Sequence, residues 1–377
     1  MQETYIFSAP GRTELGGNHT DHQRGCVLAA AVDLETTAEV TLNGTDTIRV
    51  YSEGYAPAEV QLNDLDVHAG EENTTAALVR GVAAEFVRRG AVLRGFDARV
   101  RSNVLPGSGL SSSAAFEVLM GTILNELFFE SSLSPAEVAQ IGQYAENVYF
   151  GKPCGLMDQM ASAVGGMVFI DFEYSACPTV ERIDFDLTAA GYALCIIDTG
   201  ADHADLTAEY AAIPGEMREI CRYFGKNVLR EVEKSHFFAA LPDLRGRVPD
   251  RAILRAIHFF HENERVQLQA DALRAGDVET FLALVKASGR SSWMYLQNIT
   301  PAGAVEQQAV AVALALCEEL LCGRGACRVH GGGFAGTVQA FVPLDLLENF
   351  RAGVEAVLGA GKCHVLSVRA AGGIRVK

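Results

Sequence analysis

Residues 105–115 read LPGSGLSSSAA, and they form the glycine- and serine-rich segment on which the interpretation of the fold rests. Its glycines lack a Cβ atom, so backbone N–H groups there can approach an anion closely. Three serines then open an apolar helical pattern over residues 114–128. Free N–H groups and the helix dipole favour phosphate at such a helix N-terminus, and the hydroxyls can contact phosphate or Mg²⁺. An ordinary strand–turn–helix with serine caps has the same pattern, so this segment alone leaves both interpretations open.

The common nucleotide-binding and hydrolase signatures do not occur in the sequence. There is no GxxxxGK[ST] segment, which excludes a Walker-type phosphate loop. Residues 107–112 begin like a dinucleotide-binding fingerprint, but Ser112 stands where its third glycine would be. There is also no GxSxG segment, which disfavours an α/β-hydrolase.

Three further segments carry candidate chemistry. Residues 9–22 read APGRTELGGNHTDH, and their short polar side chains can pair with sugar hydroxyl groups, although a solvated loop is the alternative. Residues 154–160 read CGLMDQM, in which Asp158 is a single acid among apolar neighbours. A buried acid needs a partner or a function, and Arg12 is a candidate partner. Residues 331–336 read GGGFAG, which indicates either a close backbone approach or a turn between two strands.

Together and in this order, the four segments resemble the motifs of the GHMP kinase superfamily, and of the galactokinase family within it. The matching stretches are residues 11–22, 106–115, 154–159 and 331–336. The resemblance implies an α+β, two-lobed fold with an N-terminal mixed-sheet lobe and a C-terminal ferredoxin-like lobe, with the active site in the cleft. It also implies an enzyme that uses ATP and Mg²⁺ to phosphorylate galactose at O1, giving galactose 1-phosphate and ADP.

The resemblance assigns roles to individual residues. The catalytic positions are matched by Asp158 and Arg12. The substrate-binding positions are matched by Asn18, His19, Asp21 and Gly155. The nucleotide-binding positions are matched by Pro106, Gly107, Ser108, Gly109, Leu110, Ser111, Ser112, Ser113 and Ala114, and the Mg²⁺ positions by Ser112, Ser113 and Glu146. These side chains suit phosphoryl transfer, which depends mainly on positioning and charge neutralisation. Asp158 either takes the O1 proton or orients that hydroxyl group.

Several residues depart from the galactokinase pattern. Asn18 stands where the family has a glutamate that contacts the C6 hydroxyl, and an amide cannot form the same charge-assisted hydrogen bond. An amide would, however, tolerate a C6 carboxylate that a glutamate would repel. A kinase for a related sugar such as galacturonate is therefore an alternative, and a non-catalytic sugar sensor is a second one. Thr13 and Glu14 also replace the usual valine and asparagine, and residues 291–303 diverge.

Composition limits the remaining classes of protein. The chain has 377 residues, of which 49% are hydrophobic, and its formal net charge is −16. It can therefore form a packed core, and its acidity disfavours nucleic-acid binding, which needs clustered Lys and Arg. No apolar run reaches the roughly 18 residues of a membrane span, residues 1–7 do not resemble a signal peptide, and nine cysteines without a CxxC pair are typical of reduced thiols. We expect a cytoplasmic monomer or weak dimer that binds a small-molecule sugar and ATP, and neither nucleic acid nor membrane.

Residue patterns also predict the main secondary-structure elements. Strands are expected at residues 26–32, 36–42, 47–51, 96–103, 167–172, 192–198 and 364–369, and helices at 74–89, 114–128, 134–149 and 309–321. Because strands and helices mix without strict βαβ alternation, the pattern favours an α+β fold. From the resemblance we place the N-terminal lobe at residues 1–170, completed by a C-terminal strand from about 364–377, and the C-terminal lobe at 171–363.

Overall fold

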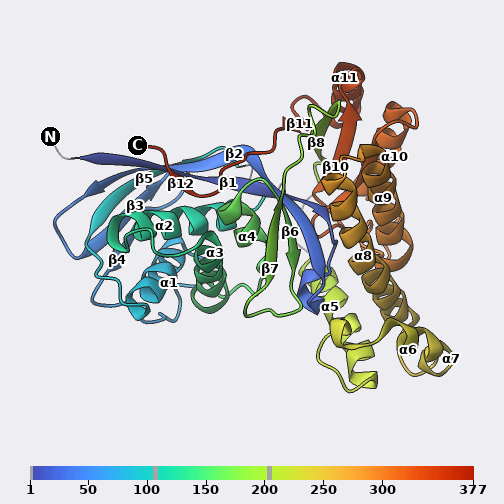
Figure 1. Ribbon diagram of the computed structural model, residues 1–377, viewed down its shortest axis with the longest axis horizontal. Helices are drawn as coiled ribbons and strands as arrows, with labels where there is room; N and C mark the ends of the chain where they lie inside the picture. Colours follow the sequence, from blue (N-terminus) through green and yellow to red (C-terminus); the bar gives the residue numbers. More distant parts are fainter. Residues whose placement is uncertain (1–2, 105–108, 202–205) are drawn as a thin grey trace.

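The computed structural model describes residues 3–104, 109–201 and 206–377, which form two β-sheets with helices packed on them (Figure 1). Within these residues the larger sheet has eight strands in the order β12-β1-β2-β5-β3-β4, with β6 paired to β2 and β7 to β6. The strands are β1 (Thr4–Gly16), β2 (Cys26–Leu42), β3 (Thr47–Ser52), β4 (Ala58–Gln61), β5 (Phe96–Ser102), β6 (Met167–Asp171), β7 (Thr179–Ile183) and β12 (Ile374–Arg375). Strands β3 and β5 are parallel, and the other pairs are antiparallel.

Strand β2 has two halves with different surroundings. Residues 36–42 pair with β5, whereas residues 26–30 pair with β6. Residues 26–32 are all buried, as expected for a strand covered on both faces, while residues 33–42 mix buried and exposed positions. Leu28 in the buried half belongs to a core that also contains Val266 and Phe281 from the second half of the chain. The inner ends of β1 and β2 therefore lie where the two halves of the molecule meet.

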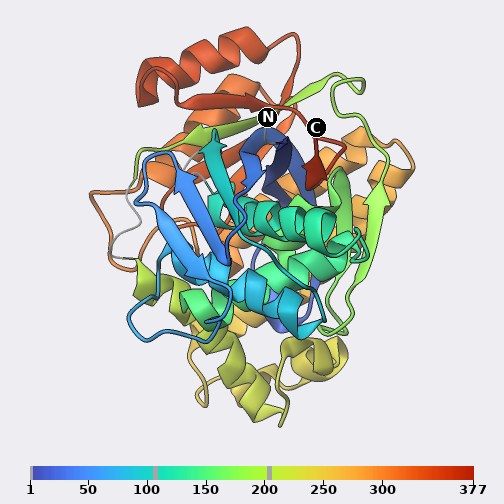
Figure 2. The same cartoon turned by 90° about the vertical axis from the view of Figure 1, so that its left-hand side faces the viewer.

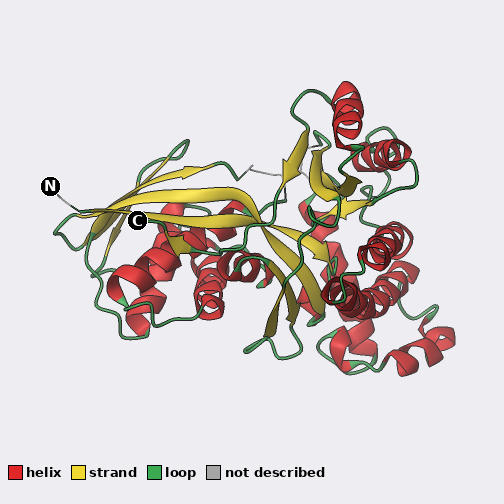
Figure 3. Ribbon diagram, turned by 45° about the horizontal axis from the view of Figure 1, so that its top comes forward, coloured by secondary structure: helices red, strands yellow, loops and turns green. Residues whose placement is uncertain are grey.

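Helices from the first half of the chain cover one face of the larger sheet (Figure 3). They are α1 (Thr75–Arg88), α2 (Ser112–Phe128), α3 (Pro135–Tyr144), the π-helical turn η2 (Ala145–Phe150) and α4 (Met157–Val164). Phe7, Phe86 and Phe96 are fully buried between these helices and the sheet. Each such side chain contributes roughly 1.5–3 kcal/mol on burial. This core fixes where α2 and α4 begin, and both helix N-termini carry predicted site residues.

The smaller sheet is antiparallel, with the strand order β11-β8-β10-β9. Its strands are β8 (Tyr192–Asp198), β9 (Ala326–His330), β10 (Thr337–Pro343) and β11 (Cys363–Leu366). Successive residues of β8 point to opposite faces, so Leu194 and Ile196 join one core while Cys195 and Ile197 join another. The first core includes helices α8 (Asp250–Arg274) and α9 (Val278–Ser291), and the second includes α10 (Ala309–Leu321) and α11 (Leu347–Leu358).

Five further elements pack around α8, and those of residues 207–244 lie at the end of the molecule shown lowest in Figure 2. They are α5 (Thr207–Tyr223), η3 (Leu229–Glu231), α6 (Lys234–Ala239), α7 (Leu241–Leu244) and the π-helical turn η4 (Ser292–Leu296). Among the described residues, none of the helices combines the length and the apolar character needed to cross a bilayer.

The expected α+β class is confirmed, and the bounds of β8 and α10 are those predicted. The helix expected over residues 134–149 ends at Tyr144 and continues as the wider turn η2, a geometry that often occurs at functional sites. The strand expected at 364–369 is β11, after which Val368 forms a bridge with Val32 in the larger sheet. The larger sheet also includes β7 and β12, and the lobe boundary at residue 170 stays a prediction.

The capping box of α3 gives a test of how local sequence stabilises this layer. The N–H group of Glu137 donates to Ser134 Oγ at 3.3 Å, and the N–H group of Ser134 donates to Glu137 Oε2 at 2.9 Å. We expect Ser134→Ala to lower the free energy of unfolding by about 0.5–2 kcal/mol, measured by denaturant unfolding. Exposed Ser132 is the matched control, and Ser132→Ala should stay within about 0.5 kcal/mol of the wild type. Equal stability of the two variants would contradict the capping role.

Candidate active site

An ion pair between Arg12 and Asp158 joins the larger sheet to its helical layer. Arg12 lies in β1, next to a register shift between Pro10 and Arg12, and Asp158 lies in the first turn of α4. The Arg12 Nε and Nη2 atoms each lie 2.7 Å from Asp158 Oδ1. The Arg12 side chain is 8% exposed, whereas that of Asp158 is 30% exposed. Asp158 therefore has the expected partner. It is only partly buried, so part of its carboxylate is exposed to solvent.

The serine-rich segment is hydrogen-bonded to both residues of this ion pair. Arg12 donates through Nη1 to the carbonyl oxygen of Gly109 and through its backbone N–H group to that of Leu110, at 3.1 Å in the second case. Ser111 Oγ donates to the other carboxylate oxygen of Asp158, Oδ2. Ser111 has φ +54° and is the N-cap residue of α2, so the loop turns sharply into that helix. Pro106, Gly107 and Ser108, which were expected to contact the nucleotide, lie outside the described residues.

Glycine is needed at position 109 for two reasons. Its φ of +72° lies in the left-handed region, and a Cβ atom there would come within 3.0 Å of His330 Nδ1. His330 is itself fixed, because its ring nitrogens lie 3.0 Å from Thr13 Oγ1 and 2.9 Å from Thr337 Oγ1. The described part of the loop is therefore held between β1 and the smaller sheet.

Glu146 is held at the N-terminus of α2 by donors from three elements. Its Oε1 atom accepts from Ser113 Oγ and from Lys152 Nζ, both at 3.3 Å. Its Oε2 atom accepts from Gln159 Nε2 at 2.8 Å. The π-helical turn η2 carries Glu146, and the residue is 2% exposed. The structure thus brings together Ser113 and Glu146, two of the residues expected to bind Mg²⁺.

A second glutamate lies beside Glu146. The amide nitrogen of Gln159 also donates to Glu117 Oε2, at 2.9 Å, so one amide links the two carboxyl groups. Burial and the charge of Glu146 raise the pKa of Glu117 well above its ordinary value. Burial and the same charge raise the pKa of the Cys154 thiol. Both shifts favour the protonated form, and for the Cys154 thiol this argues against an activated nucleophile.

The turn between β1 and β2 carries the predicted sugar-binding residues. Asp21 begins the short helix η1 (Asp21–Gln23), and its carboxylate lies against Gly155, where a Cβ atom would overlap Oδ2. Only glycine fits at position 155 beside this carboxylate. Burial, together with the nearby charge of Asp158, raises the pKa of Asp21 to about 6.

Two neutral histidines lie in the same turn. His19 Nε2 lies 3.1 Å from the carbonyl oxygen of Gly332, and His22 Nε2 lies 3.4 Å from His19 Nδ1. Burial lowers the pKa of His19, and burial together with His19 lowers the pKa of His22 to about 3. Both nitrogens of His19 are engaged in these contacts, whereas His22 Nδ1 has no partner among the described residues and can bond a hydroxyl group; neither imidazole supplies a positive charge at neutral pH.

Asn18 has a different environment from the one expected. Its side chain is fully buried, and Nδ2 donates to the carbonyl oxygen of Gly331 at 2.7 Å. Its Oδ1 atom accepts from Asn298 Nδ2 at 2.8 Å and from Ser292 Oγ at 3.3 Å. In contrast to the expectation that Asn18 faces C6 of a sugar, its amide is used inside the protein. It links the glycine segment 331–336 to the turn that follows β1.

Sequence reasoning did not identify Asn298, Lys152, Glu117 or Gln159. Asn298 donates to the carbonyl oxygen of Gly332 at 3.2 Å as well as to Asn18. It lies within residues 291–303, and the divergence of that stretch was the signal that could have drawn attention to it. Gln159 lies within the CGLMDQM segment, directly after Asp158, and its place in that motif was the signal that could have found it. We find no sequence signal for Glu117 or Lys152.

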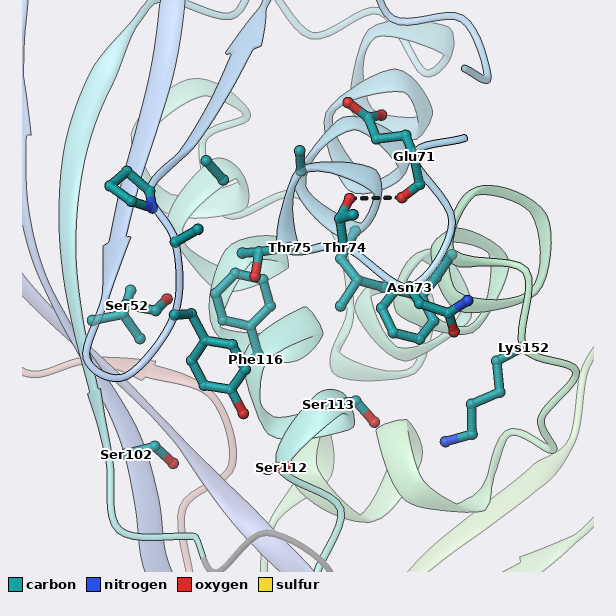
Figure 4. Close-up of a pocket in the computed structure, with 18 of the residues that line it drawn as sticks. Ser52, Glu71, Asn73, Thr74, Thr75, Ser102, Ser112, Ser113, Phe116 and Lys152 are labelled. Atoms are coloured by element: carbon teal, nitrogen blue, oxygen red, sulfur yellow. Dashed lines mark hydrogen bonds between the residues drawn. The ribbon is translucent and has the colours of Figure 1, made fainter. Parts of the chain in front are cut away.

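A pocket of about 1070 Å³ opens beside the N-terminus of α2 (Figure 4). Ser112 and Ser113 line it at the helix end, and the side chain of Lys152 extends into it toward Ser113. Aromatic residues also line it, namely Tyr55, Phe116 and Phe150. The pocket therefore combines an apolar part with a polar end that presents hydroxyl groups and a helix N-terminus.

Among the described residues, no group of three or more His, Cys, Asp or Glu side chains is arranged around a possible ion position. Mg²⁺ commonly uses one or two carboxylates and completes its shell with water and phosphate oxygens. Glu146 beside Ser113 fits that kind of site, and it does not fit an all-protein cage.

The raised pKa of Asp21 means that its ionised carboxylate lowers the free energy of unfolding at neutral pH. Because its pKa is higher in the folded than in the unfolded chain, the free energy of unfolding falls as pH rises through the range from about 4 to about 6. We expect Asp21→Asn to be more stable than the wild type at pH 7.5, and this gain to shrink at pH 4.5. Denaturant unfolding at both values measures it, with exposed Asp184→Asn as the control. A gain of equal size at both values would contradict the assignment.

Two family models match parts of this chain. The family model for the GHMP kinases N terminal domain matches residues 77–166, and the galactokinase galactose-binding signature matches residues 1–42. Galactokinase from Lactococcus lactis, solved in complex with galactose, is similar with 27% identity and a TM-score of 0.84, covering 99% of this chain and 95% of that one.

More distant structures share the fold. Mevalonate kinase from Methanococcus jannaschii has 13% identity and a TM-score of 0.68, covering 97% of this chain and 98% of that one. Phosphomevalonate kinase from Streptococcus pneumoniae has 13% identity and a TM-score of 0.66, covering 99% of each chain.

Proposed function

We propose that this chain, a galactokinase-like sugar kinase with the GHMP kinase fold, transfers the γ-phosphoryl group of ATP to O1 of galactose and releases galactose 1-phosphate and ADP. The observation that carries the proposal is the ion pair between Arg12 and Asp158. Arg12 lies in the part of the chain that matches the galactose-binding signature, and Asp158 lies in the part that matches the GHMP kinase domain. The pair therefore brings a sugar-binding and a phosphate-binding segment to one point.

Asp158 is the proposed catalytic residue. Arg12 contacts Oδ1 through two nitrogens and Ser111 donates to Oδ2, and the exposed side of the carboxylate leaves room for a sugar hydroxyl group. In this arrangement the carboxylate accepts a hydrogen bond from the O1 hydroxyl and directs its oxygen toward the phosphate. Asp158 either accepts the O1 proton as bond formation proceeds or holds the hydroxyl in line. In both cases most of the rate gain comes from positioning and charge neutralisation.

We place the nucleotide in the pocket beside α2. The triphosphate would lie at the helix N-terminus, where Ser112 and Ser113 offer hydroxyl groups and the helix dipole favours negative charge. The base would occupy the part lined by Tyr55 and Phe116. Glu146 and Ser113, with Ser112 beside them, would hold Mg²⁺. When bound, the ion supplies positive charge that neutralises the phosphate oxygens during transfer.

We place the sugar against the turn that carries His19 and Asp21, with Gly155 giving the carboxylate room. The alternative substrate galacturonate was suggested by Asn18 in place of the glutamate that contacts C6, but the amide of Asn18 is used within the protein. In addition, the two neutral imidazoles at this turn offer no cation for a C6 carboxylate. These observations favour a neutral sugar, and galactose is the one that the matched signature names.

A coupled assay of ADP release tests the proposed substrate. We expect turnover with ATP, Mg²⁺ and galactose to exceed turnover with galacturonate, N-acetylgalactosamine or glucose. A preference for galacturonate would overturn the proposed substrate while keeping the kinase assignment. No nucleotide turnover with any of the four sugars would instead favour the non-catalytic sensor.

Replacement of Asp158 tests the proposed catalytic residue. We expect Asp158→Asn and Asp158→Ala to lower kcat by about 10²-fold or more, the range typical of a lost general base or orienting group. Steady-state kinetics measures this, and the unfolding midpoint of each variant shows whether the fold is kept. A folded variant with a near-normal kcat would refute the role of Asp158.

Replacement of Glu146 tests the proposed metal position. We expect Glu146→Gln to raise the Mg²⁺ concentration needed for half-maximal turnover by at least about tenfold, since weaker perturbations of metal sites already have effects of that size. The measurement is a Mg²⁺ titration at saturating ATP and galactose. Exposed Glu306→Gln is the control and should leave the titration unchanged. An unchanged titration for Glu146→Gln would remove this residue from the metal site.

A further inference from the structure

Lys152 is the single lysine or arginine among the described residues that line the pocket beside α2. Two acids, Glu53 and Glu71, also line the pocket, and the whole chain carries a net charge of −16. A nucleotide triphosphate would therefore meet few positive charges of the protein there. Lys152 lies in the loop between η2 and α4, and its side chain points toward Ser113 (Figure 4).

The other cations near this region are already engaged by carboxylates. Arg12 contacts Asp158 through two nitrogens and Gly109 through a third. Arg80 donates to both carboxylate oxygens of Glu71, at 2.7 and 2.9 Å. Neither guanidinium can turn toward a phosphate without leaving a carboxylate unpaired.

Lys152, in contrast, is held loosely. Its ammonium group lies 3.3 Å from Glu146 Oε1, and its side chain is 61% exposed. The pair joins an exposed ammonium to a buried carboxylate, so the ammonium, unlike Glu146, can reach solvent and other acceptors. Glu146 does not depend on it, because Ser113 and Gln159 donate to the same carboxylate. A purely structural role for Lys152 therefore has little support.

We propose that Lys152 is a phosphate-binding residue whose ammonium group exchanges Glu146 for the phosphate oxygens of the bound nucleotide. In the free protein it lies on the carboxylate, and nucleotide binding draws it toward Ser113 and the N-terminus of α2. Its departure leaves Glu146 Oε1 with a free acceptor position facing the phosphates. This inference rests on the nucleotide site of the proposed function and adds a specific cation to that site.

Binding measured without metal separates this role from catalysis. Isothermal titration in EDTA gives the Kd of ATP and of adenosine for the wild type, Lys152→Met, Lys152→Arg and the control Lys226→Met, a change at an exposed lysine elsewhere. We expect Lys152→Met to weaken ATP binding about tenfold or more, the effect of losing one charge-assisted hydrogen bond. Adenosine, which has no phosphate, should bind equally to all four proteins. Lys152→Arg should restore most of the ATP affinity, and Lys226→Met should behave as the wild type.

Two further readouts sharpen the test. With Mg²⁺ and galactose present, Lys152→Met should raise KM for ATP while KM for galactose stays unchanged. The wild-type Kd for ATP should also depend more steeply on salt than that of Lys152→Met, because added ions screen the lost contact.

The outcomes distinguish the inference from the function on which it rests. Equal ATP affinity of the wild type and Lys152→Met would overturn the inference and leave the nucleotide site intact. Parallel loss of ATP and adenosine binding in Lys152→Met would also overturn it, by showing a structural effect. A wild-type chain that binds neither ATP nor adenosine would overturn the nucleotide site, and with it the role of Lys152.

Discussion

The contact between Arg12 and Asp158 is the constraint on which the active site depends. A buried guanidinium is stable only when its donors are satisfied, and Arg12 meets this need with Asp158 and the carbonyl oxygen of Gly109. These acceptors come from α4 and from the loop before α2, so satisfying one side chain fixes three elements. The same contact orients the carboxylate that is proposed to receive the sugar hydroxyl. The same pair therefore holds three elements together and orients the proposed catalytic carboxylate.

Around that pair, two glutamates lie close together in different surroundings. Glu146 accepts three hydrogen bonds, whereas Glu117, linked to it through Gln159, has a pKa raised well above its ordinary value. A raised pKa favours the protonated form of Glu117, which lessens the repulsion between the two carboxyl groups. Burial also raises the pKa of Asp21, to about 6. Burial and neighbouring charges thus oppose ionisation at two of the acids of the site.

Part of the candidate site could be predicted from the sequence, because the residues of each motif lie close together in the chain. The serine-rich segment predicted a helix N-terminus, and Asp158 among apolar residues predicted a partner, which is Arg12. The direction of Asn18 could not be predicted, since it depends on Asn298 and Gly331, far away in sequence. The π-helical turn at Glu146 was also missed, because an apolar helical pattern does not show where an extra residue widens a turn. Lys152 carries no motif, and only the pocket shows what it faces.

The topology of the larger sheet has a consequence for how the chain folds. Strand β1 pairs on one side with β2, which follows it closely, and on the other side with β12, which comes from the opposite end of the sequence. The N–H group of Ile6 also donates to the carbonyl oxygen of Lys377, at 2.9 Å. During synthesis, the β12 edge of β1 therefore stays without its partner strand until residues 374–375 have been made. An unpaired strand edge can join a strand from another chain, so contacts between nascent chains compete with folding for longer than the local β1–β2 pairing would suggest.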